Sequence, residues 1–579
     1  MNELAPIAVC VPLVGAALLV AIFARVSKLA VEIAATLAGL ATLALCCVIL
    51  ASVAAHGASV LWFGGWHPGN TVGLGIAFVV DPAGAAVAAC VAFVVTGAIV
   101  FSRQYFDDVG AIFYVLLLAM LGAMVAFAYA ADAFDLFVFY EVFSVAAYAI
   151  SAYRVERKSA YEGSLQFALV NSVAGLFVLG GIIVLEGSTG ELNLAAIGRS
   201  LPAQHASAPL VAFAFAAIAA GLFARGALAP LHFWFDEVHA NAPTPLCVVL
   251  SGAMVPLALF GFVRLYLVAF STVLPPAAGP AFVLCAAGVV SAVVGSLMCL
   301  RQLALKRMLA FATVAHAGVA AISLSAFTAP AFAGAALYLG GYAFAVAGLF
   351  MAVAVVRSVT KRNVDLFASA GAGRRFYLTG TIFALGTCEV AGVWPSARAI
   401  VAGGSGAHAL LVLASFVLVA GATGGACARA FSTVFVLDRV RSKRGNVPWF
   451  MLVPAFAFVA TPLLAAAPAV PAFVERAAND LLDVERYRAI SLGAAVVTRA
   501  PGIAPGGLPL AWLATLSAAV VAYLCIARAR PVRRFRVFAG RNAAMLVLAR
   551  VHDGDVGAYV AWLVGAAIAA TASVLASRP

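Results

Sequence analysis

Long runs without any charged residue constrain this sequence more than any other feature. Pro6–Phe23, Val211–Phe223 and Phe282–Leu300 are examples, and several runs approach or reach the roughly 20 residues that a membrane-spanning helix needs. Only 10% of the residues are charged and 65% are hydrophobic, whereas soluble globular domains carry about 25% and about 45–50%. The sequence therefore predicts an all-α polytopic membrane protein whose helices face the lipid bilayer.

Charges between the apolar runs indicate the topology. About 14–16 helices are expected, with spans near residues 5–24, 29–52, 76–101, 110–130, 132–152, 164–186, 208–228, 245–269, 276–300, 303–326, 330–356, 376–402, 407–430, 449–467, 509–527 and 557–576. Nearly every second loop is basic, and the exception is an acidic loop with Asp236 and Glu237 after the seventh helix. The positive-inside rule then places both termini on the non-cytoplasmic face of the cell inner membrane. The start of the chain is interpreted as a first transmembrane helix because it lacks the basic residues of a signal peptide.

Two segments near the C-terminus depart from the pattern of helix and short loop. Residues 470–505 are expected to form an external loop, which is either an outer cap or a solvated connection. Residues 528–550 alternate basic and apolar positions. That mixture suits a segment lying in the cytoplasmic interface of the membrane.

Charged residues also occur inside the apolar runs, where each one costs at least about 2.5–3.5 kcal/mol and requires a reason. Glu141 ends the apolar stretch Asp135-Leu-Phe-Val-Phe-Tyr-Glu. Its carboxyl group can bind and release protons there, or it can serve only as a buried hydrogen-bonding group. Arg225 follows an apolar helix that Pro230 interrupts. It is expected either to pair with Glu141 or to extend to the cytoplasmic interface.

Three histidines lie in or beside the apolar runs. Histidine titrates near neutral pH and can relay protons. His232 and His239 follow the break at Pro230 and belong either to a proton relay or to a solvated loop. His316 stands two to three turns into an apolar helix, where a proton relay competes with a hydrogen-bonded packing role.

A second carboxylate lies beside another helix break. Glu389 precedes Pro395, and it is expected to end the relay or to pair with Arg398. The sequence contains no HExxH pattern, no CxxC pair among its ten cysteines, no phosphate loop and no nucleotide-binding glycine motif. We therefore expect no catalytic residue, cofactor or metal site. We also expect no nucleic-acid partner, because the net charge of +12 follows the topology.

Four stretches together indicate a family. They are Asp135-Leu-Phe-Val-Phe-Tyr-Glu, the segment 229–245 around Pro-Leu-His-Phe-Trp-Phe-Asp-Glu-Val-His, the segment 305–318 beginning Leu-Lys-Arg, and the tail 551–563. They resemble the antiporter-like subunits shared by respiratory complex I, Mrp cation/proton antiporters and energy-converting membrane hydrogenases. The similarity covers roughly residues 60–450 and the tail.

The resemblance implies two inverted five-helix repeats, broken helices 7 and 12, and a charged axis that carries protons across the membrane. The expected parts are N-terminal helices at 1–105, a first repeat at 106–270, a second repeat at 271–440, and C-terminal helices at 441–579. By position, Glu141 takes the glutamate of helix 5, Arg225 takes the lysine of helix 7, and His316 takes the histidine of helix 10.

The sequence departs from the family at its lysines. The helix-8 lysine falls on Pro256, the helix-11 histidine and lysine fall on Tyr342 and Val346, and the helix-12 lysine falls on Ser396. A buried lysine can release its proton, whereas arginine stays protonated. The relay is therefore incomplete by the family pattern, with Glu389 as a partial substitute. The predicted proton pathway consists of Glu141, Arg225, His232, His239, His316 and Glu389.

Two functions remain. The first is a proton-translocating, or cation- and proton-translocating, membrane subunit of a multisubunit respiratory, hydrogenase-like or Mrp-like complex, with other membrane subunits and a peripheral redox arm as partners. Such a chain is part of an oxidoreductase or translocase without catalytic chemistry of its own. The alternative is a non-pumping membrane scaffold that anchors catalytic or peripheral subunits, including those of an inorganic-carbon uptake system. The missing lysines motivate this alternative.

Overall fold

The computed structural model describes residues 3–22, 27–65, 75–103, 105, 110–153, 158–360, 366, 369–402, 406–437, 447–493, 565, 569, 571 and 572. The expected helices at 509–527 and 557–576, the interfacial segment 528–550 and the tail 551–563 lie mainly or wholly outside these residues.

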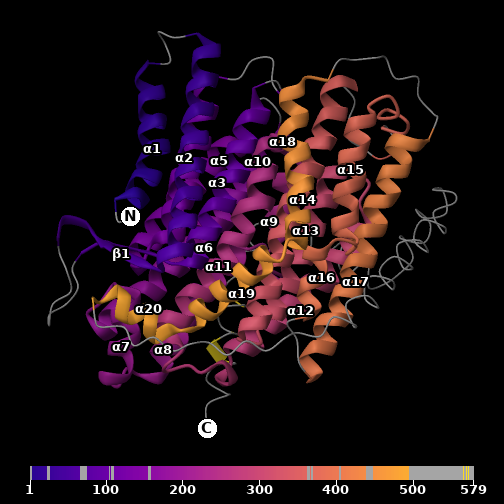
Figure 1. Cartoon of the computed structure of the whole chain (residues 1–579). Helices are drawn as coiled ribbons and strands as arrows, with labels where there is room; N and C mark the ends of the chain where they lie inside the picture. The colour runs from indigo at the N-terminus through magenta and orange to yellow at the C-terminus, as the bar shows by residue number, and fades with distance from the viewer. Residues whose placement is uncertain are drawn as a thin grey trace.

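The described chain is a bundle of helices with one short β-hairpin (Figure 1). The first part consists of α1 (Leu4–Ile22), α2 (Lys28–His56), β1 (Ser59–Trp62), η2 (Phe63–Gly65), β2 (Ala77–Val80), α3 (Pro82–Ser102), α4 (Ala111–Tyr129), α5 (Ala133–Ser151), α6 (Lys158–Thr189), α7 (Leu194–Ala203), α8 (Ala208–Arg225), α9 (Phe233–Asn241), α10 (Thr244–Val249), η3 (Leu250–Met254), α11 (Val255–Leu265) and η4 (Tyr266–Phe270). The second part consists of η5 (Pro276–Ala278), α12 (Pro280–Arg301), α13 (Leu305–Leu324), α14 (Ala329–Thr360), α15 (Tyr377–Val390), α16 (Pro395–Ala402), α17 (Gly406–Phe431), η6 (Ser432–Val436), α18 (Trp449–Ala460), η7 (Thr461–Ala466), α19 (Ala469–Leu482) and α20 (Val484–Ser491).

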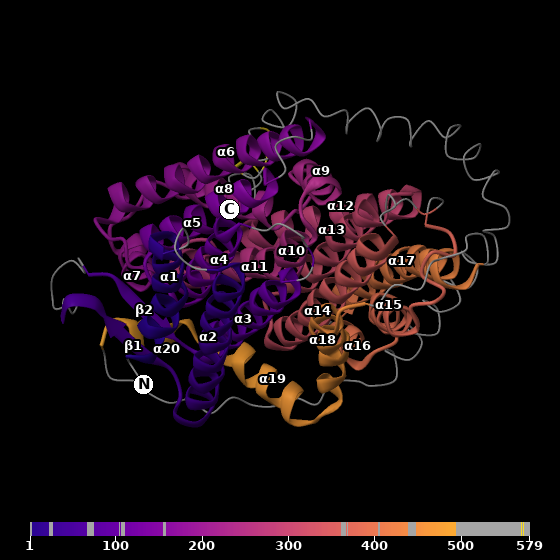
Figure 2. The ribbon, with the colours of Figure 1, turned by 90° about the horizontal axis from the view of Figure 1, so that it is seen from above.

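Thirteen of the described helical segments are long and apolar enough to cross a membrane. They coincide with the first fourteen expected spans except the twelfth, which is divided between α15 and α16. Seen from above, α1–α8 and α12–α18 form two groups side by side, with α10 and α11 between them, while α20 lies with the first group beside β1 and β2 (Figure 2). The prediction of an all-α multi-pass membrane protein is confirmed.

Small residues bring α12 and α13 into direct backbone contact. A Cβ atom at Gly288 would lie 2.7 Å from the Gly318 carbonyl oxygen, and one at Gly295 would lie 2.8 Å from the Phe311 carbonyl oxygen. Such small-residue contacts are the usual means of helix association in membranes, where lipid provides no hydrophobic driving force between helices. This contact fixes the position of α13, which carries His316.

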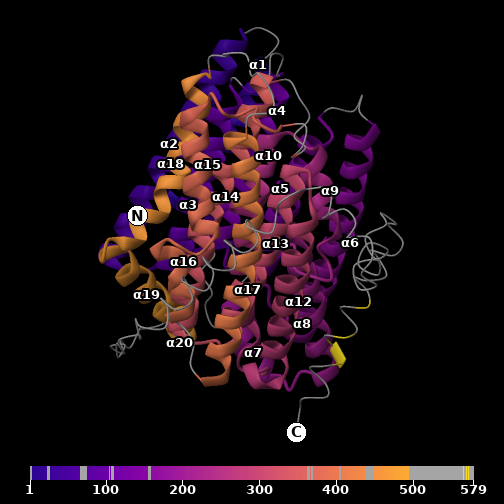
Figure 3. The same ribbon diagram turned by 90° about the vertical axis from the view of Figure 1, so that its right-hand side faces the viewer.

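Helices α19 and α20 run along the outside of the bundle in its lower half (Figures 1 and 3), and α19 packs against α14 and α3. The Arg488 guanidinium of α20 donates to the Val268 carbonyl oxygen of η4 at 2.7 Å, and the Trp62 indole donates to the Ser491 carbonyl oxygen at 3.1 Å. The Arg488 side chain is buried by these contacts. The described part of segment 470–505 is therefore a packed cap rather than a solvated loop.

The expected acidic loop after the seventh helix is wrong. Asp236 and Glu237 belong to α9, which packs against α6 and α13 and follows α8 after a break. The Arg307 guanidinium of α13 donates to Glu237 Oε1 at 2.6 Å. Helix packing and this ion pair hold the acidic stretch in a partly exposed helix, where loop charge alone predicted a solvated connection.

Candidate functional site

The break between α8 and α9 ends the first helix in an orderly way. Ala227 adopts a left-handed conformation with φ of 53°, and the Leu228 amide donates to the Phe223 carbonyl at 2.9 Å. This pattern is a Schellman motif, which satisfies carbonyl groups that a helix end leaves free. The Trp234 indole of α9 donates to the Ala224 carbonyl at 3.0 Å. The break therefore holds Arg225, the last residue of α8, in a defined place.

Arg225 is fully buried and lacks a carboxylate partner among the described residues. Its guanidinium carbon lies 4.1 Å from the centre of the Tyr140 ring, and Nη2 lies 3.5 Å from the Tyr148 hydroxyl. Its Nε and Nη1 atoms have no hydrogen-bond partner. A desolvated cation over an aromatic face gains about 2 kcal/mol. The expected reach of Arg225 to the membrane interface is therefore wrong.

Glu141 points away from Arg225 although the two residues lie on neighbouring helices. Consecutive residues of an α-helix are about 100° apart around its axis. Tyr140 therefore faces α8, while the Glu141 carboxylate lies against Gly175 of α6. Glu141 is half-buried, and its Oε1 atom is buried without a hydrogen-bond partner. The expected ion pair of Glu141 and Arg225 is not formed.

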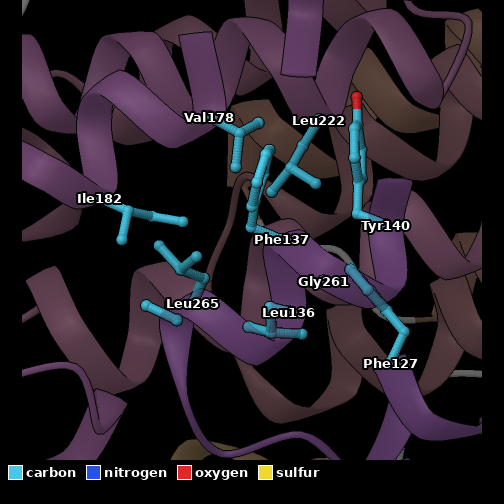
Figure 4. A pocket seen from close by; sticks show the side chains of 10 residues that line it. Phe127, Leu136, Phe137, Tyr140, Val178, Ile182, Leu222, Gly261 and Leu265 are labelled. Atoms are coloured by element: carbon cyan, nitrogen blue, oxygen red, sulfur yellow. The ribbon is translucent and has the colours of Figure 1, made fainter. Parts of the chain in front are cut away.

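A small apolar pocket lies beside Tyr140, the aromatic residue that contacts Arg225 (Figure 4). Its lining comes from α4, α5, α6, α8 and α11 and consists of Phe127, Ala133, Leu136, Phe137, Tyr140, Val178, Ile182, Leu222, Gly261 and Leu265. The Tyr140 ring borders the pocket, while its hydroxyl points away and donates to the Gly221 carbonyl at 3.1 Å. Tyr140 thus joins the apolar pocket on one side to the Arg225 guanidinium on the other.

Two buried carboxylates mark the beginning of α5, the helix that carries Glu141. Asp132 caps the helix by accepting from the amides of Phe134 and Asp135. Burial raises the pKa of the Asp132 carboxyl group above its usual value, although these two donors oppose the effect. The Oδ2 atom of Asp135 is buried without a hydrogen-bond partner. Acidic residues are common near helix N-termini, so the sequence pattern alone does not distinguish this pair as functional.

The histidines of the broken helix are buried, so the solvated-loop interpretation is wrong for both. His232 precedes α9 and lies against Phe233 and Phe311. In α9, His239 Nδ1 lies 2.7 Å from the Phe235 carbonyl oxygen and Nε2 lies 2.9 Å from the Ser251 hydroxyl. Because a carbonyl can only accept, Nδ1 carries the hydrogen and Nε2 accepts from the hydroxyl when the ring is neutral.

His316 lies between three helices and is satisfied on both sides. Its Nδ1 atom lies 2.7 Å from the Tyr338 hydroxyl of α14, and Nε2 lies 3.0 Å from the Thr423 hydroxyl of α17. Thr423 donates its own hydrogen to the Val419 carbonyl at 2.7 Å. The ring therefore donates from Nε2, and a neutral imidazole completes the network. Tyr342, at the position expected for the helix-11 histidine, stacks on His316 at 3.9 Å.

Glu389 and Ser396 meet across the second break. The Ser396 hydroxyl lies 2.8 Å from both carboxylate oxygens of Glu389. Both side chains pack against Gly341 of α14, one turn from Tyr338. Glu389 thus bonds to the residue at the missing lysine position and not to Arg398.

The structure brings the predicted pathway residues into three groups. Glu141 and Arg225 lie near the first break, His232 and His239 lie on or beside α9, and His316 lies on the same side of α14 as Glu389. No group of three histidine, cysteine or acidic residues within the described part of the chain could hold a metal ion. The arrangement provides buried groups that can carry charge or relay protons.

Residues 130–435 match the protein family described as "NADH:quinone oxidoreductase/Mrp antiporter, TM". The chain belongs to this family. The matched residues form more than half of the chain and contain every predicted pathway residue. The family predicted from the four motifs is confirmed.

Curated relatives of the family are similar over part of their length. NADH-quinone oxidoreductase subunit N 1 of Solibacter usitatus is 30% identical over 281 residues, which are 48% of this chain and 57% of that relative. NADH-quinone oxidoreductase subunit N of Desulforudis audaxviator is 30% identical over 374 residues, which are 62% of this chain and 71% of the relative. The chain thus spans between about half and seven-tenths of the curated relatives it matches.

The fold also occurs in solved structures. A chain in the structure of the Mrp complex from Dietzia sp. DQ12-45-1b superposes with a TM-score of 0.75 and 20% identity, covering 85% of this chain and 100% of the other. At this identity the likeness shows a shared fold.

Proposed function

We propose that this chain is a proton-translocating membrane subunit of a multisubunit complex, with Glu141 and Arg225 at its centre. One observation carries the proposal. A permanently charged guanidinium lies fully buried among membrane helices without a carboxylate partner among the described residues. Near it, the buried Oε1 atom of Glu141 has no hydrogen-bond partner in that part of the chain. Leaving a buried charge uncompensated is costly. Such a cost is expected where the local charge must change during function.

In this proposal the predicted pathway residues have different roles. Glu141 binds and releases the proton, and Arg225 stabilises the carboxylate when it is ionised, because arginine remains protonated throughout. His232 and His239 continue the path along α9. His316 and Glu389 form a side branch in the second part of the bundle, on which little of the flux depends. The two broken helices support the proposal that residues 106–270 and 271–440 are inverted repeats.

We place the protein in the cell inner membrane with α1 beginning on the non-cytoplasmic side. Lys28, Arg301 and Arg357 lie at the helix ends opposite the α19–α20 cap, which is the cytoplasmic side under the positive-inside rule. The partners are other membrane subunits. The named relatives and the Mrp structure support either a redox arm or sister antiporter subunits.

The direct test uses the complex purified from its native membrane and returned to liposomes with a pH-sensitive dye. Glu141→Gln keeps the size of the side chain but removes its ability to ionise. We expect proton flux per assembled complex to fall by about 10²-fold, the usual contribution of a positioned proton-transfer group. Glu186→Gln, on the exposed end of α6, is the matched control and keeps wild-type flux. Wild-type flux in Glu141→Gln would contradict the proposal.

A membrane scaffold is the second candidate, and one observation favours it. His316 is completely satisfied as a neutral ring, and Ser396 replaces the family lysine beside Glu389. Extraction in mild detergent, followed by identification of the bound subunits, separates the two functions. If redox subunits or sister antiporter subunits remain bound, translocation is supported. If a single peripheral enzyme remains bound and the complex with Glu141→Gln works as well as the wild type, the scaffold is supported.

A further inference from the structure

Lys306 is buried at the beginning of α13. Its side chain is 4% exposed, and its ammonium donates to the Ala242 carbonyl oxygen, just after α9, at 2.6 Å. The next residue, Arg307, pairs with Glu237 of α9 and remains one-third exposed. In the sequence both residues stand side by side at the start of the segment 305–318. The structure separates them into a surface ion pair and a buried cation.

Lysine is rare in this chain. The sequence contains five lysines, Lys28, Lys158, Lys306, Lys361 and Lys443, against thirty arginines. Lys28 and Lys158 are exposed. Among the lysines whose side chains the structure describes, Lys306 is thus the buried one. This matters because a buried lysine can lose its proton, whereas the guanidinium of Arg225 cannot.

The Cys247 thiol and two backbone carbonyl groups lie between Lys306 and the first broken helix. The Cys247 thiol of α10 approaches the Ala242 carbonyl at 4.0 Å and the His239 carbonyl at 3.6 Å. The His239 ring in turn contacts Ser251. Ser251 belongs to η3, a π-helical turn, and such turns occur frequently at functional sites. The same membrane span carries Pro256 where the family has a lysine.

This group lies at the end of the bundle opposite the cap. Residues 244–270 form one long span, with Lys306 near its first residue and α20 packed against η4 at its last. The neighbouring Glu237 and Arg307 are partly exposed at that end. Lys306 is therefore located between an accessible face and the interior histidine.

We propose that Lys306 is a proton-loading residue that replaces the lysine missing at Pro256. The ammonium of Lys306 releases one proton towards the His239–Ser251 pair and becomes a neutral amine. His239 accepts one proton at Nε2 and becomes an imidazolium. Lys306 then regains a proton from water at the adjoining face. This inference rests on the proposed translocation function and assigns its entrance on that face.

Replacing Lys306 with arginine tests whether Lys306 loads protons or only forms a structural contact. Lys306→Arg keeps a cation and donors for the Ala242 carbonyl but cannot deprotonate. In the reconstituted complex we expect normal assembly and a fall in proton flux of about 10²-fold. Lys158→Arg, at an exposed ion pair, is the matched control and keeps wild-type flux. Wild-type flux in Lys306→Arg would overturn the proposal and show a structural clamp.

A second variant covers the case in which arginine does not fit. Lys306→Gln retains a hydrogen-bond donor without charge, and it is expected to assemble with the same loss of flux. Lys306→Gln with wild-type flux also overturns the proposal. Glu141→Gln, measured in the same liposomes, separates the loading role of Lys306 from the translocation function of the chain. Flux that depends on Glu141 but not on Lys306 refutes only the loading role, whereas flux independent of Glu141 refutes the translocation function itself.

Discussion

The two breaks, after α8 and after α15, share one backbone design. At the first, the Leu228 amide bonds to the Phe223 carbonyl at 2.9 Å, and Ala227 is left-handed. At the second, the Val393 amide bonds to the Cys388 carbonyl at 2.9 Å, and Gly392 is left-handed with φ of 78°. Both are Schellman motifs, and each is followed by a proline.

The side chains at the two breaks differ. Arg225 in the first motif occupies the position that Val390 occupies in the second, and Glu389 in the second occupies the position of Ala224 in the first. Within the described ranges, the first break therefore holds a cation without a carboxylate partner, and the second holds a carboxylate bonded to Ser396. A backbone that interrupts a membrane helix does not by itself determine the charge placed there. We infer that proton translocation depends chiefly on the first break.

The largest expected effect concerns a buried arginine that does have a partner. The Arg264 guanidinium contacts both oxygens of Asp81 at 2.8 Å, and both side chains are almost fully buried. Asp81→Asn leaves this cation unpaired, so we expect a loss of about 3–5 kcal/mol in stability. Thermal unfolding of the purified complex measures it. Unchanged flux per folded complex is expected, and a loss of flux without loss of stability would place this pair in the pathway.

Removing Arg225 should lower the proton flux and leave the stability almost unchanged, which is the opposite of the effect expected at Asp81. Arg225→Met removes the cation near Glu141, and we expect proton flux to fall by about 10²-fold, as for loss of a preorganised electrostatic group. Stability should change little, because no carboxylate loses a partner. Arg225→Lys keeps the cation and should keep most of the flux. Severe unfolding of Arg225→Met with normal residual flux would mean that the arginine is structural.

At the second break, the hydroxyl of Ser396 is expected to act on stability. Ser396→Ala leaves the buried Glu389 carboxyl group without its hydrogen bond, which costs about 1–3 kcal/mol. The midpoint of thermal unfolding should fall, while flux per assembled complex stays near the wild-type value. Ser415→Ala, whose hydroxyl bonds within its own helix α17, is the control.

The smallest effect is expected at Tyr148. Its hydroxyl lies at the long distance of 3.5 Å from Arg225 Nη2. Tyr148→Phe removes this contact and keeps the ring, so a change of about 0.5 kcal/mol, or roughly twofold in flux, is expected. Initial rates of dye quenching are precise enough to detect it. A tenfold loss would show that the hydroxyl itself passes the proton.

Much of the fold could be predicted from the sequence, and the partners of the site residues could not. Apolar runs gave the spans because helix length follows from membrane thickness. Pro230 and Pro395 indicated the breaks. The contact of Arg225 with Tyr140 rather than Glu141 depends on which side of α5 packs against α8. The burial of Lys306 depends on where α9 ends. The pattern of charges along the sequence gives neither the packed side of α5 nor the end of α9.

The measurement that tests this account most directly compares one carboxylate from each part of the bundle in the same assembled complex. Proton flux into liposomes is measured for Glu141→Gln and for Glu389→Gln, each corrected for the amount of complex. We expect a fall of about 10²-fold for Glu141→Gln and nearly unchanged flux for Glu389→Gln, whose amide can still bond to Ser396. Equal losses, or a larger loss at Glu389, would contradict the conclusion that the first break governs translocation.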